Sequence, residues 1–155
     1  REYGADVIYL ADSAGAMTPQ QMRDRVQAVE AVVDCPIGVH THNNLGLGVG
    51  NAITAVECGV SYLDGTLSGM GRGAGNCALE ALIGFLKNPR YQLDPLLRFI
   101  QKDILALKEA GCVWGYDIPY LLTGLLDQHP RTAIAATKAH DTNYSAFYQM
   151  LLDKD

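Results

Sequence analysis

Two histidines, His40 and His42, lie two residues apart at the end of an apolar, β-forming run, and Asn43 and Asn44 follow at once. Side chains two residues apart on a strand point to the same face, so both imidazoles can reach one divalent ion. Such an ion also needs an oxygen ligand and open positions for substrate. An isolated His-x-His pair is more often structural, because imidazoles also serve as hydrogen bonders inside proteins. The asparagines and the strand-end position favour the metal interpretation.

A glycine-rich loop forms the second group, Gly69-Met70-Gly71-Arg72-Gly73-Ala74-Gly75-Asn76, and a helix is predicted directly after it. Backbone amides before a helix N-terminus favour carboxylate or phosphate groups. The loop also fits a relaxed dinucleotide fingerprint, but Asp94, at the spacing of the acidic partner, starts a helix instead of ending a strand. A tight turn that needs positive φ explains the glycines equally well.

Asp12 and Ser13 form the third group, after another apolar run. Both residue types are common in turns and helix caps, so a purely structural role is open for them.

The elements that must position these groups alternate between strand and helix. Continuous apolar runs are typical of strands buried on both faces of a parallel sheet. Repetition at about 30 residues indicates βαβ units, in which functional groups gather at the carboxyl ends of the strands. We therefore expect all three groups at one rim. The predicted strands are Asp6–Ala11, Pro36–His42 and Val60–Leu67, and the helices run from a Thr18 cap to about Val33, from Leu45 (or a later start near Gly48) to Cys58, and from Cys77 to Leu86.

The remaining sequence is predicted to be helical, without a further strand. A long amphipathic helix starts at Asp94 and ends at Gly111, and shorter helices follow at about Tyr120–Asp127, Arg131–Ala139 and Tyr144–Leu152. We expect residues 1–90 to supply βα units of a barrel and residues 91–155 to form a helical region packed on it. A closed (β/α)8 barrel needs about 250 residues, so the 155 residues are either part of one or a small open sheet.

Composition narrows the function classes. Hydrophobic residues make up 48% and charged residues 19%, which excludes intrinsic disorder. A net charge of -5 argues against a dedicated nucleic-acid binder or a polybasic membrane anchor, and no apolar stretch predicts a membrane span. The cysteines form no CxxC pair and no signal peptide is visible, so we expect reduced thiols and a cytoplasmic protein.

The three groups together resemble the metal-dependent aldolase and lyase barrels, the hydroxymethylglutaryl-CoA lyase-like superfamily. Their order, spacing and strand-end positions agree, and the similarity extends from about Asp6 to Leu86. Ser13 and the Gly-Met-Gly-x-Gly-Ala-Gly-Asn loop are most similar to the 4-hydroxy-2-oxovalerate aldolase branch. Isopropylmalate synthases carry a Gly-Glu-Arg-Ala-Gly-Asn type of loop instead.

The resemblance implies the C-terminal part of a (β/α)8 TIM barrel with a helical C-terminal extension. It implies a lyase that cleaves or forms a C–C bond at a 2-oxo acid through a pyruvate enolate, with Mn²⁺ as the favoured cofactor and Mg²⁺, Co²⁺ or Zn²⁺ as alternatives. The general base and a further metal-binding aspartate would lie in a missing N-terminal half. The implied site residues are His40, His42 and Asn76 for the metal, Ser13 and Tyr120 for catalysis, and Asp12, Gly71, Gly73 and Gly75 for substrate binding.

Several partners and alternatives accompany this interpretation. The expected partners are a small 2-oxo acid, the missing half of the barrel, a second copy of the chain and an aldehyde dehydrogenase, with no nucleic acid and no membrane. One alternative is an acyl-CoA-dependent synthase or lyase of the isopropylmalate synthase type. A nucleotide-binding α/β module and a non-catalytic half-barrel are the others.

Overall fold

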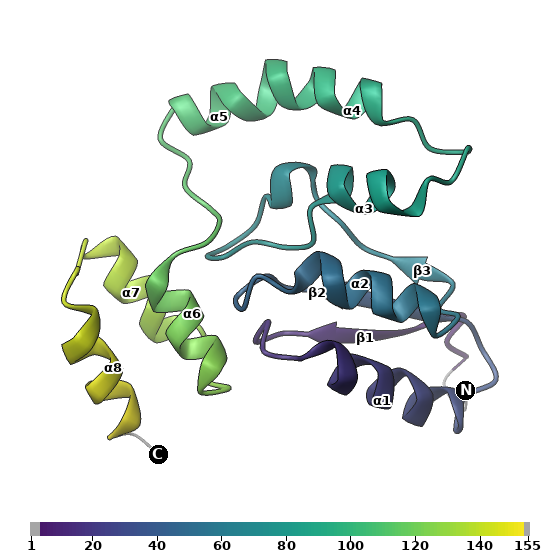
Figure 1. The fold of residues 1–155 in the computed structure, drawn as a ribbon, viewed down its shortest axis with the longest axis horizontal. Helices are drawn as coiled ribbons and strands as arrows, with labels where there is room; N and C mark the ends of the chain where they lie inside the picture. The colour runs from purple at the N-terminus through teal and green to yellow at the C-terminus, as the bar shows by residue number, and fades with distance from the viewer. Residues whose placement is uncertain (1–3, 154–155) are drawn as a thin grey trace.

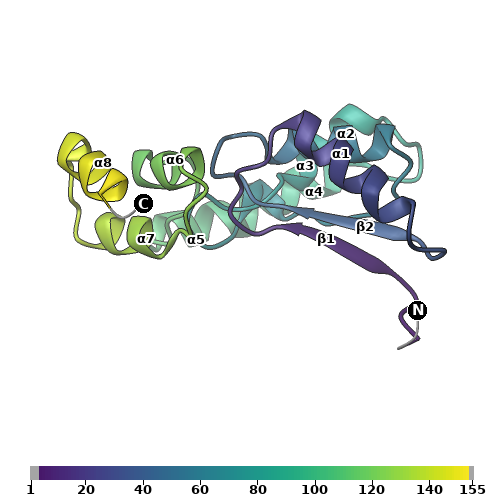
Figure 2. The same cartoon turned by 90° about the horizontal axis from the view of Figure 1, so that it is seen from below.

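The computed structural model describes residues 4–153 and contains one parallel sheet with the strand order β1-β2-β3 (Figure 1). In the register, Ile8 pairs with Ile37 and Asp12 with Thr41. The helices α1 and α2 lie on one side of β1 and β2, and α6, α7 and α8 lie beyond the carboxyl ends of these strands (Figure 2). The predicted α/β class with parallel strands is thus confirmed. The bounds are β1 Ile8–Asp12, α1 Pro19–Glu30, β2 Ile37–Thr41, α2 Gly48–Glu57, β3 Tyr62–Leu63, the 3-10 helix η1 Leu67–Gly69 and α3 Leu79–Leu86.

Local sequence explains where the first two helices begin. The predicted capping box of α1 is present: the Gln21 amide donates to Thr18 Oγ1 at 3.3 Å, and the Thr18 amide donates to Gln21 Oε1 at 2.8 Å. These contacts satisfy amides that the first helical turn leaves unpaired. The helix α2 begins at Gly48, the later of the two predicted starts, and its start is fixed by the Gly48 amide donating to Asn43 Oδ1 at 3.0 Å.

The third strand is shorter than predicted, because the chain leaves β2 after Leu63 and pairs with a later segment. The Thr66 amide donates to the Cys77 carbonyl at 2.9 Å, and the Leu79 amide donates to the Thr66 carbonyl at 2.9 Å. Residues beyond the glycine-rich loop therefore take the place that a longer β3 would occupy. The predicted strand over Val60–Leu67 was therefore wrong in its extent: the strand is present, but only over Tyr62–Leu63.

The C-terminal part is helical, and residues 4–153 contain no strand after β3, as predicted. The long amphipathic helix is present, but five of its residues form a π-helical turn. Its successive parts are α4 Leu93–Phe99, η2 Ile100–Ile104 and α5 Leu105–Glu109, and the shorter helices are α6 Ile118–Leu125, α7 Arg131–Lys138 and α8 Tyr144–Leu152.

Two apolar clusters stabilise the part of the chain that carries the three groups. One lies between the sheet and its covering helices and contains Met22, Val26 and Val39. The other is built from α6, α7 and α8 and includes Ala74 of the glycine-rich loop. The loop is therefore attached through Ala74 to the C-terminal helices. No helix within residues 4–153 combines the length and apolarity that crossing a membrane requires.

Gly75 is expected to be intolerant of a side chain. Its φ is +79°, and a Cβ would lie 2.1 Å from the Gly69 carbonyl oxygen. Gly75→Ala should lower the free energy of unfolding by about 1–3 kcal/mol, since both strain and a backbone clash result. Gly84→Ala is the matched control: it lies in α3 with open space around the added methyl, and should stabilise by about 0.5–1 kcal/mol. Urea unfolding followed by circular dichroism measures both, and equal effects would contradict the assignment.

Candidate metal centre

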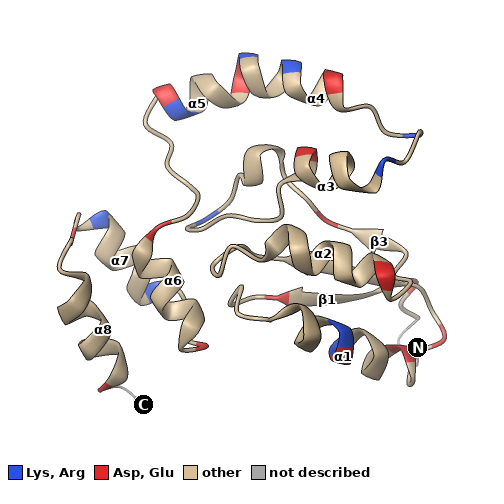
Figure 3. Cartoon of the chain, viewed as in Figure 1, with Lys and Arg blue, Asp and Glu red and all other residues tan. Residues whose placement is uncertain are grey.

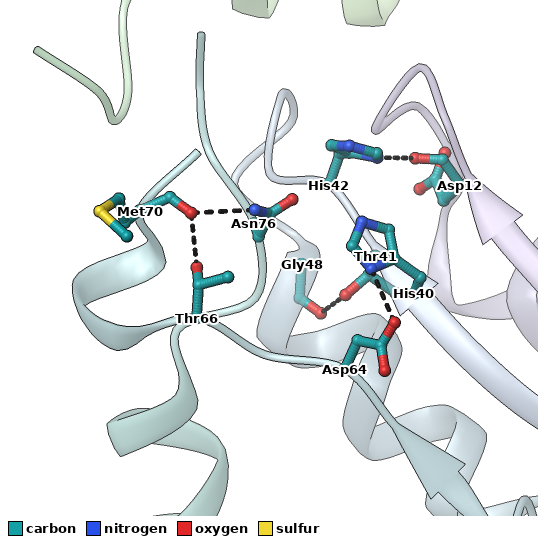
Figure 4. Close-up of polar contacts among 9 residues, drawn as sticks. All are labelled: Asp12, His40, Thr41, His42, Gly48, Asp64, Thr66, Met70 and Asn76. Atoms are coloured by element: carbon teal, nitrogen blue, oxygen red, sulfur yellow. Dashed lines mark hydrogen bonds and ion pairs between the residues drawn. The ribbon is translucent and has the colours of Figure 1, made fainter. Parts of the chain in front are cut away.

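The structure brings the two strand-end imidazoles together on the sheet face that the helices leave uncovered. Val39 and Thr41 are buried on the opposite, helix-covered face of β2. The ring centroids of His40 and His42 lie 4.8 Å apart with planes at 74°, an edge-to-face arrangement (Figure 4). Strand alternation therefore gives the same-side placement that a shared ligand would need.

Hydrogen bonds fix which nitrogen of each imidazole stays available. His42 Nδ1 lies 2.7 Å from the carbonyl oxygen of Asp12, and His40 Nδ1 lies 3.1 Å from Asp64 Oδ2. A carbonyl oxygen and a carboxylate only accept, so both Nδ1 atoms carry the proton. The lone pair of each neutral ring is then on Nε2, the arrangement found in metal-ligating histidines.

Asn76 joins this pair through backbone pairing with the end of β2. The Asn43 amide donates to the Gly75 carbonyl and the Cys77 amide donates to the Thr41 carbonyl, each at 3.0 Å. The side-chain amide nitrogen of Asn76 donates to the Met70 carbonyl at 2.9 Å. Within residues 4–153 no hydrogen bond to its oxygen is found, and this oxygen points to the side on which His42 lies (Figure 4).

Two imidazole nitrogens and one amide oxygen match the mixed donor set of a divalent transition ion with open positions. Within residues 4–153, no three or more His, Cys, Asp or Glu side chains cluster as a metal site. The described residues thus offer donors of the types that fit such an ion, and their role as ligands stays a prediction.

Asp12 fixes the loop after β1 through its side chain and orients His42 through its backbone carbonyl. Its side chain is 3% exposed, and its carboxylate accepts from the Ala16 amide at 3.1 Å and the Met17 amide at 3.3 Å. These contacts fit the cap-like role that the sequence left open. Its carbonyl meanwhile orients His42, so Asp12 is a positioning residue, and direct contact of its side chain with substrate stays a prediction.

Ser13 and Tyr120 lie on the same side of the site as His42. Both line a small recess of about 10 Å³ together with His42. Tyr120 is buried, and a Cβ at Gly73 would lie 2.7 Å from its ring. Asn44 also lines the recess, and its side-chain nitrogen is buried with no hydrogen-bond partner among the described residues. A buried donor without a partner is unusual and points to a ligand.

The predicted loop glycines allow close packing at three places, of which the contact of Gly73 with Tyr120 is given above. A Cβ at Gly71 would lie 2.5 Å from the Asn76 side-chain nitrogen, so a side chain there would displace the candidate ligand. Gly75 is needed for the backbone turn described above. Within the described chain, the amides of Gly71 and Gly73 have no acceptor, whereas the Gly75 amide donates to the Arg72 carbonyl. Their contact with substrate stays a prediction.

Asp64 is a site residue to which the sequence analysis gives no role. Its amide donates to the Val39 carbonyl at 3.1 Å, which places its side chain on the same face as His40. After the effect of burial, its negative charge also helps to raise the pKa of the nearby Tyr9 phenol. The signal that would find it is the register of the parallel strands, which a single chain's hydrophobic pattern does not contain.

Cys77 directly follows Asn76 and is fully buried. Burial raises the pKa of its thiol to about 11, so it has little nucleophilic character at neutral pH. The four cysteines are free thiols, as expected.

The comparison with protein families matches the part of the chain that carries the three groups of candidate residues. The HMGL-like family model covers residues 1–102. A 4-hydroxy-2-oxovalerate aldolase of Pelotomaculum thermopropionicum is 50% identical over 128 residues, which is 74% of this chain and 37% of that protein. A 4-hydroxy-2-oxovalerate aldolase of Carboxydothermus hydrogenoformans is 51% identical over 90 residues, covering 58% of this chain and 27% of that protein. The chain thus spans well under half the length of these relatives.

Among solved structures, the N-terminal domain of an aldolase-like protein from Bacteroides vulgatus is similar over nearly the whole chain. Its TM-score is 0.78 at 30% identity, and the match covers 92% of this chain and 48% of that one. The similarity thus extends beyond the βα units into the C-terminal helices.

The thiol of Cys77 is predicted to be inert in the folded protein. At pH 8, a pKa of about 11 means that roughly one Cys77 side chain in a thousand is a thiolate. Its burial also keeps thiol reagents away from the sulfur. We expect 5,5′-dithiobis(2-nitrobenzoate) to modify the exposed Cys112 quickly and Cys77 only after unfolding. Cys112→Ser should remove the fast phase. Rapid labelling of Cys77 in the native state, located by mass spectrometry, would contradict the prediction.

Proposed function

The chain belongs to the HMGL-like family, and from this we propose that it is part of a divalent-metal-dependent aldolase acting on a 2-oxo acid of the 4-hydroxy-2-oxovalerate type. The reaction would cleave or form the C–C bond next to a pyruvate unit. The observation that carries the proposal is the pair of imidazoles whose Nδ1 atoms are held by Asp12 and Asp64, which leaves both Nε2 atoms available.

His40, His42 and Asn76 would hold the ion. Mn²⁺ is our first choice, because the resemblance to the aldolases implies it, and Mg²⁺, Co²⁺ and Zn²⁺ are the alternatives, since imidazole and amide oxygen suit several divalent ions. When bound, such an ion supplies Lewis-acid chemistry at the keto oxygen of a 2-oxo acid. Asp12 and Asp64 orient the imidazoles and keep the proton on Nδ1, a contact of the kind that raises metal affinity.

The other residues would bind and orient the substrate. The amides of Gly71 and Gly73, which have no acceptor among the described residues, would donate to the substrate carboxylate, as backbone amides in glycine-rich turns do. Ser13 and Asn44 offer hydrogen-bond donors at the recess, and Tyr120 would orient the aldehyde half of the substrate. We assign the general base, which must take the proton from the C4 hydroxyl, to none of these residues.

The alternatives from the sequence are not favoured. Two relatives that are about 50% identical to this chain are named 4-hydroxy-2-oxovalerate aldolase. Their names speak against the acyl-CoA-dependent synthase and the nucleotide-binding module. An aldehyde dehydrogenase partner, a second copy of the chain, a cytoplasmic location and the division at residue 90 stay predictions.

Removing both imidazoles should abolish metal binding and activity together. We expect His40→Ala/His42→Ala to lose bound Mn²⁺, measured by elemental analysis after gel filtration, and to form no pyruvate from 4-hydroxy-2-oxovalerate in a lactate dehydrogenase-coupled assay. His129→Ala is the matched control, because its exposed ring only accepts from the Arg131 amide at 3.2 Å. Mn²⁺ retained at the same stoichiometry in the double variant would overturn the ligand assignment.

Asp64→Asn should weaken metal binding without unfolding the protein. The Asp64 side chain is 47% exposed, so little packing depends on it. Loss of its charge should lower the affinity for Mn²⁺ by about 10- to 100-fold, the usual cost of losing a carboxylate behind a ligating histidine. Isothermal titration calorimetry with Mn²⁺ measures the affinity of this variant, and Asp24→Asn on the exposed face of α1 is the control. Equal affinities of Asp64→Asn and wild type would refute the positioning role.

A further inference from the structure

A second, larger cavity lies beside the recess, between the glycine-rich loop and the helices α6 and α7. Its volume is about 610 Å³. Arg72, Gly73, Tyr120 and Ile134 line both this cavity and the recess that contains His42. The two spaces therefore adjoin along one wall. The larger cavity is therefore the space next to His42 that has room for a substrate, since the recess itself holds only about 10 Å³.

The charged side chains that line the cavity are mostly basic. Arg72 of the loop and Lys138 at the end of α7 are exposed and form no ion pair within residues 4–153, and His140 adds an imidazole. Figure 3 shows a basic stretch in the loop before α3 and another at one end of α7. An excess of cationic groups around a partly enclosed space attracts anions.

Asp117 is the one carboxylate among the residues that line the cavity, so one negative charge stands against the two positive charges of Arg72 and Lys138. Oδ1 accepts from the Ile118 amide at 2.8 Å, where it caps α6, and Oδ2 accepts from Thr137 Oγ1 at 3.1 Å. Its side chain is thus committed to holding α6 against α7. The guanidinium and the ammonium group stay available for a ligand.

The remaining wall is aromatic and held in place. The Trp114 indole N–H donates to the Ser68 carbonyl at 2.9 Å, and the Lys108 ammonium lies 4.9 Å from the centre of the Trp114 rings. The Gly115 amide donates to the Gly73 carbonyl at 3.0 Å, which fastens this segment to the loop. A rigid aromatic surface next to basic groups suits an organic anion better than a free inorganic ion.

We propose that this cavity binds an anionic group, phosphate or carboxylate, at the far end of the aldehyde half of the substrate. The proposal rests on the proposed aldolase function and extends its substrate class to 2-oxo acids whose aldehyde half is longer than that of 4-hydroxy-2-oxovalerate and ends in an anion. Arg72 would contact the anion with its paired N–H groups and Lys138 as a point charge. Trp114 and Tyr116 would pack along the carbon chain.

Binding is tested without catalysis. Trp114 is the single tryptophan of the chain, so its fluorescence reports on the cavity. Glycerol 3-phosphate should change this fluorescence in the protein, and glycerol should not. Arg72→Gln/Lys138→Gln should raise the Kd for glycerol 3-phosphate about tenfold or more, since charge-assisted contacts are lost. Lys102→Gln in η2, outside the cavity, is the matched control and should leave the Kd unchanged.

Selectivity is tested in the addition of pyruvate to aldehydes. The methyl carbon of pyruvate loses one proton and bonds to the aldehyde carbon, whose oxygen gains one proton, so no other reagent is consumed. Wild type should prefer glyceraldehyde 3-phosphate to glyceraldehyde, or succinic semialdehyde to butanal if the anion is a carboxylate. In Arg72→Gln/Lys138→Gln, the ratio of kcat/KM for the anionic over the neutral aldehyde should fall about tenfold or more.

The outcomes separate the two proposals. Turnover of neutral aldehydes without any preference for anions, and without a fluorescence response, overturns the cavity assignment and leaves the aldolase proposal standing. A fluorescence response that Arg72→Gln/Lys138→Gln weakens, in a complete (β/α)8 barrel containing this chain that turns over no aldehyde, supports the anion site and overturns the aldolase proposal.

Discussion

The hydrogen bond from His42 Nδ1 to the carbonyl oxygen of Asp12 is the contact on which the candidate centre depends, because it joins two strands and sets one ligand. It forms only because β1 and β2 are parallel with Asp12 opposite Thr41, which places His42 just beyond the Asp12 carbonyl. The buried carboxylate of Asp12 keeps that carbonyl in position by accepting two amides of the following loop. A substitution at Asp12 would thus act on His42 without touching a metal.

The glycine-rich loop connects the candidate centre with the C-terminal helices. Its last residues pair with the end of β2, which brings Asn76 beside His42. Ala74, two residues earlier, is buried in the cluster of α6, α7 and α8. One short segment therefore fixes a candidate ligand, closes the recess against Tyr120 and sets the position of Arg72 at the neighbouring cavity. A residue larger than glycine at Gly71, Gly73 or Gly75 would disturb this arrangement, since an added Cβ would lie less than 3.0 Å from neighbouring atoms.

The local features of this arrangement could be predicted from sequence, and the long-range ones could not. The Thr18 cap, the parallel strands and the pair of histidines depend on residues near one another, and each is found where the pattern indicates. The short β3 depends on Thr66 pairing with Cys77 across the loop, and Asp64 meets His40 through inter-strand register. Neither contact leaves a periodic mark in the sequence, and the resemblance to a family named the ligands but not Asp64.

The two histidines are held by different means, and this difference has a chemical consequence. His42 donates to the backbone carbonyl of the buried residue Asp12, whereas His40 donates to the carboxylate of Asp64, whose side chain is half exposed. In the proposed metal site, a carboxylate acceptor behind an imidazole strengthens its bond to the ion more than a neutral acceptor does. His40 would thus bind the ion through a ring supported by a negative charge. His42 would bind it through a ring fixed by buried backbone, at the recess that Ser13 and Tyr120 also line.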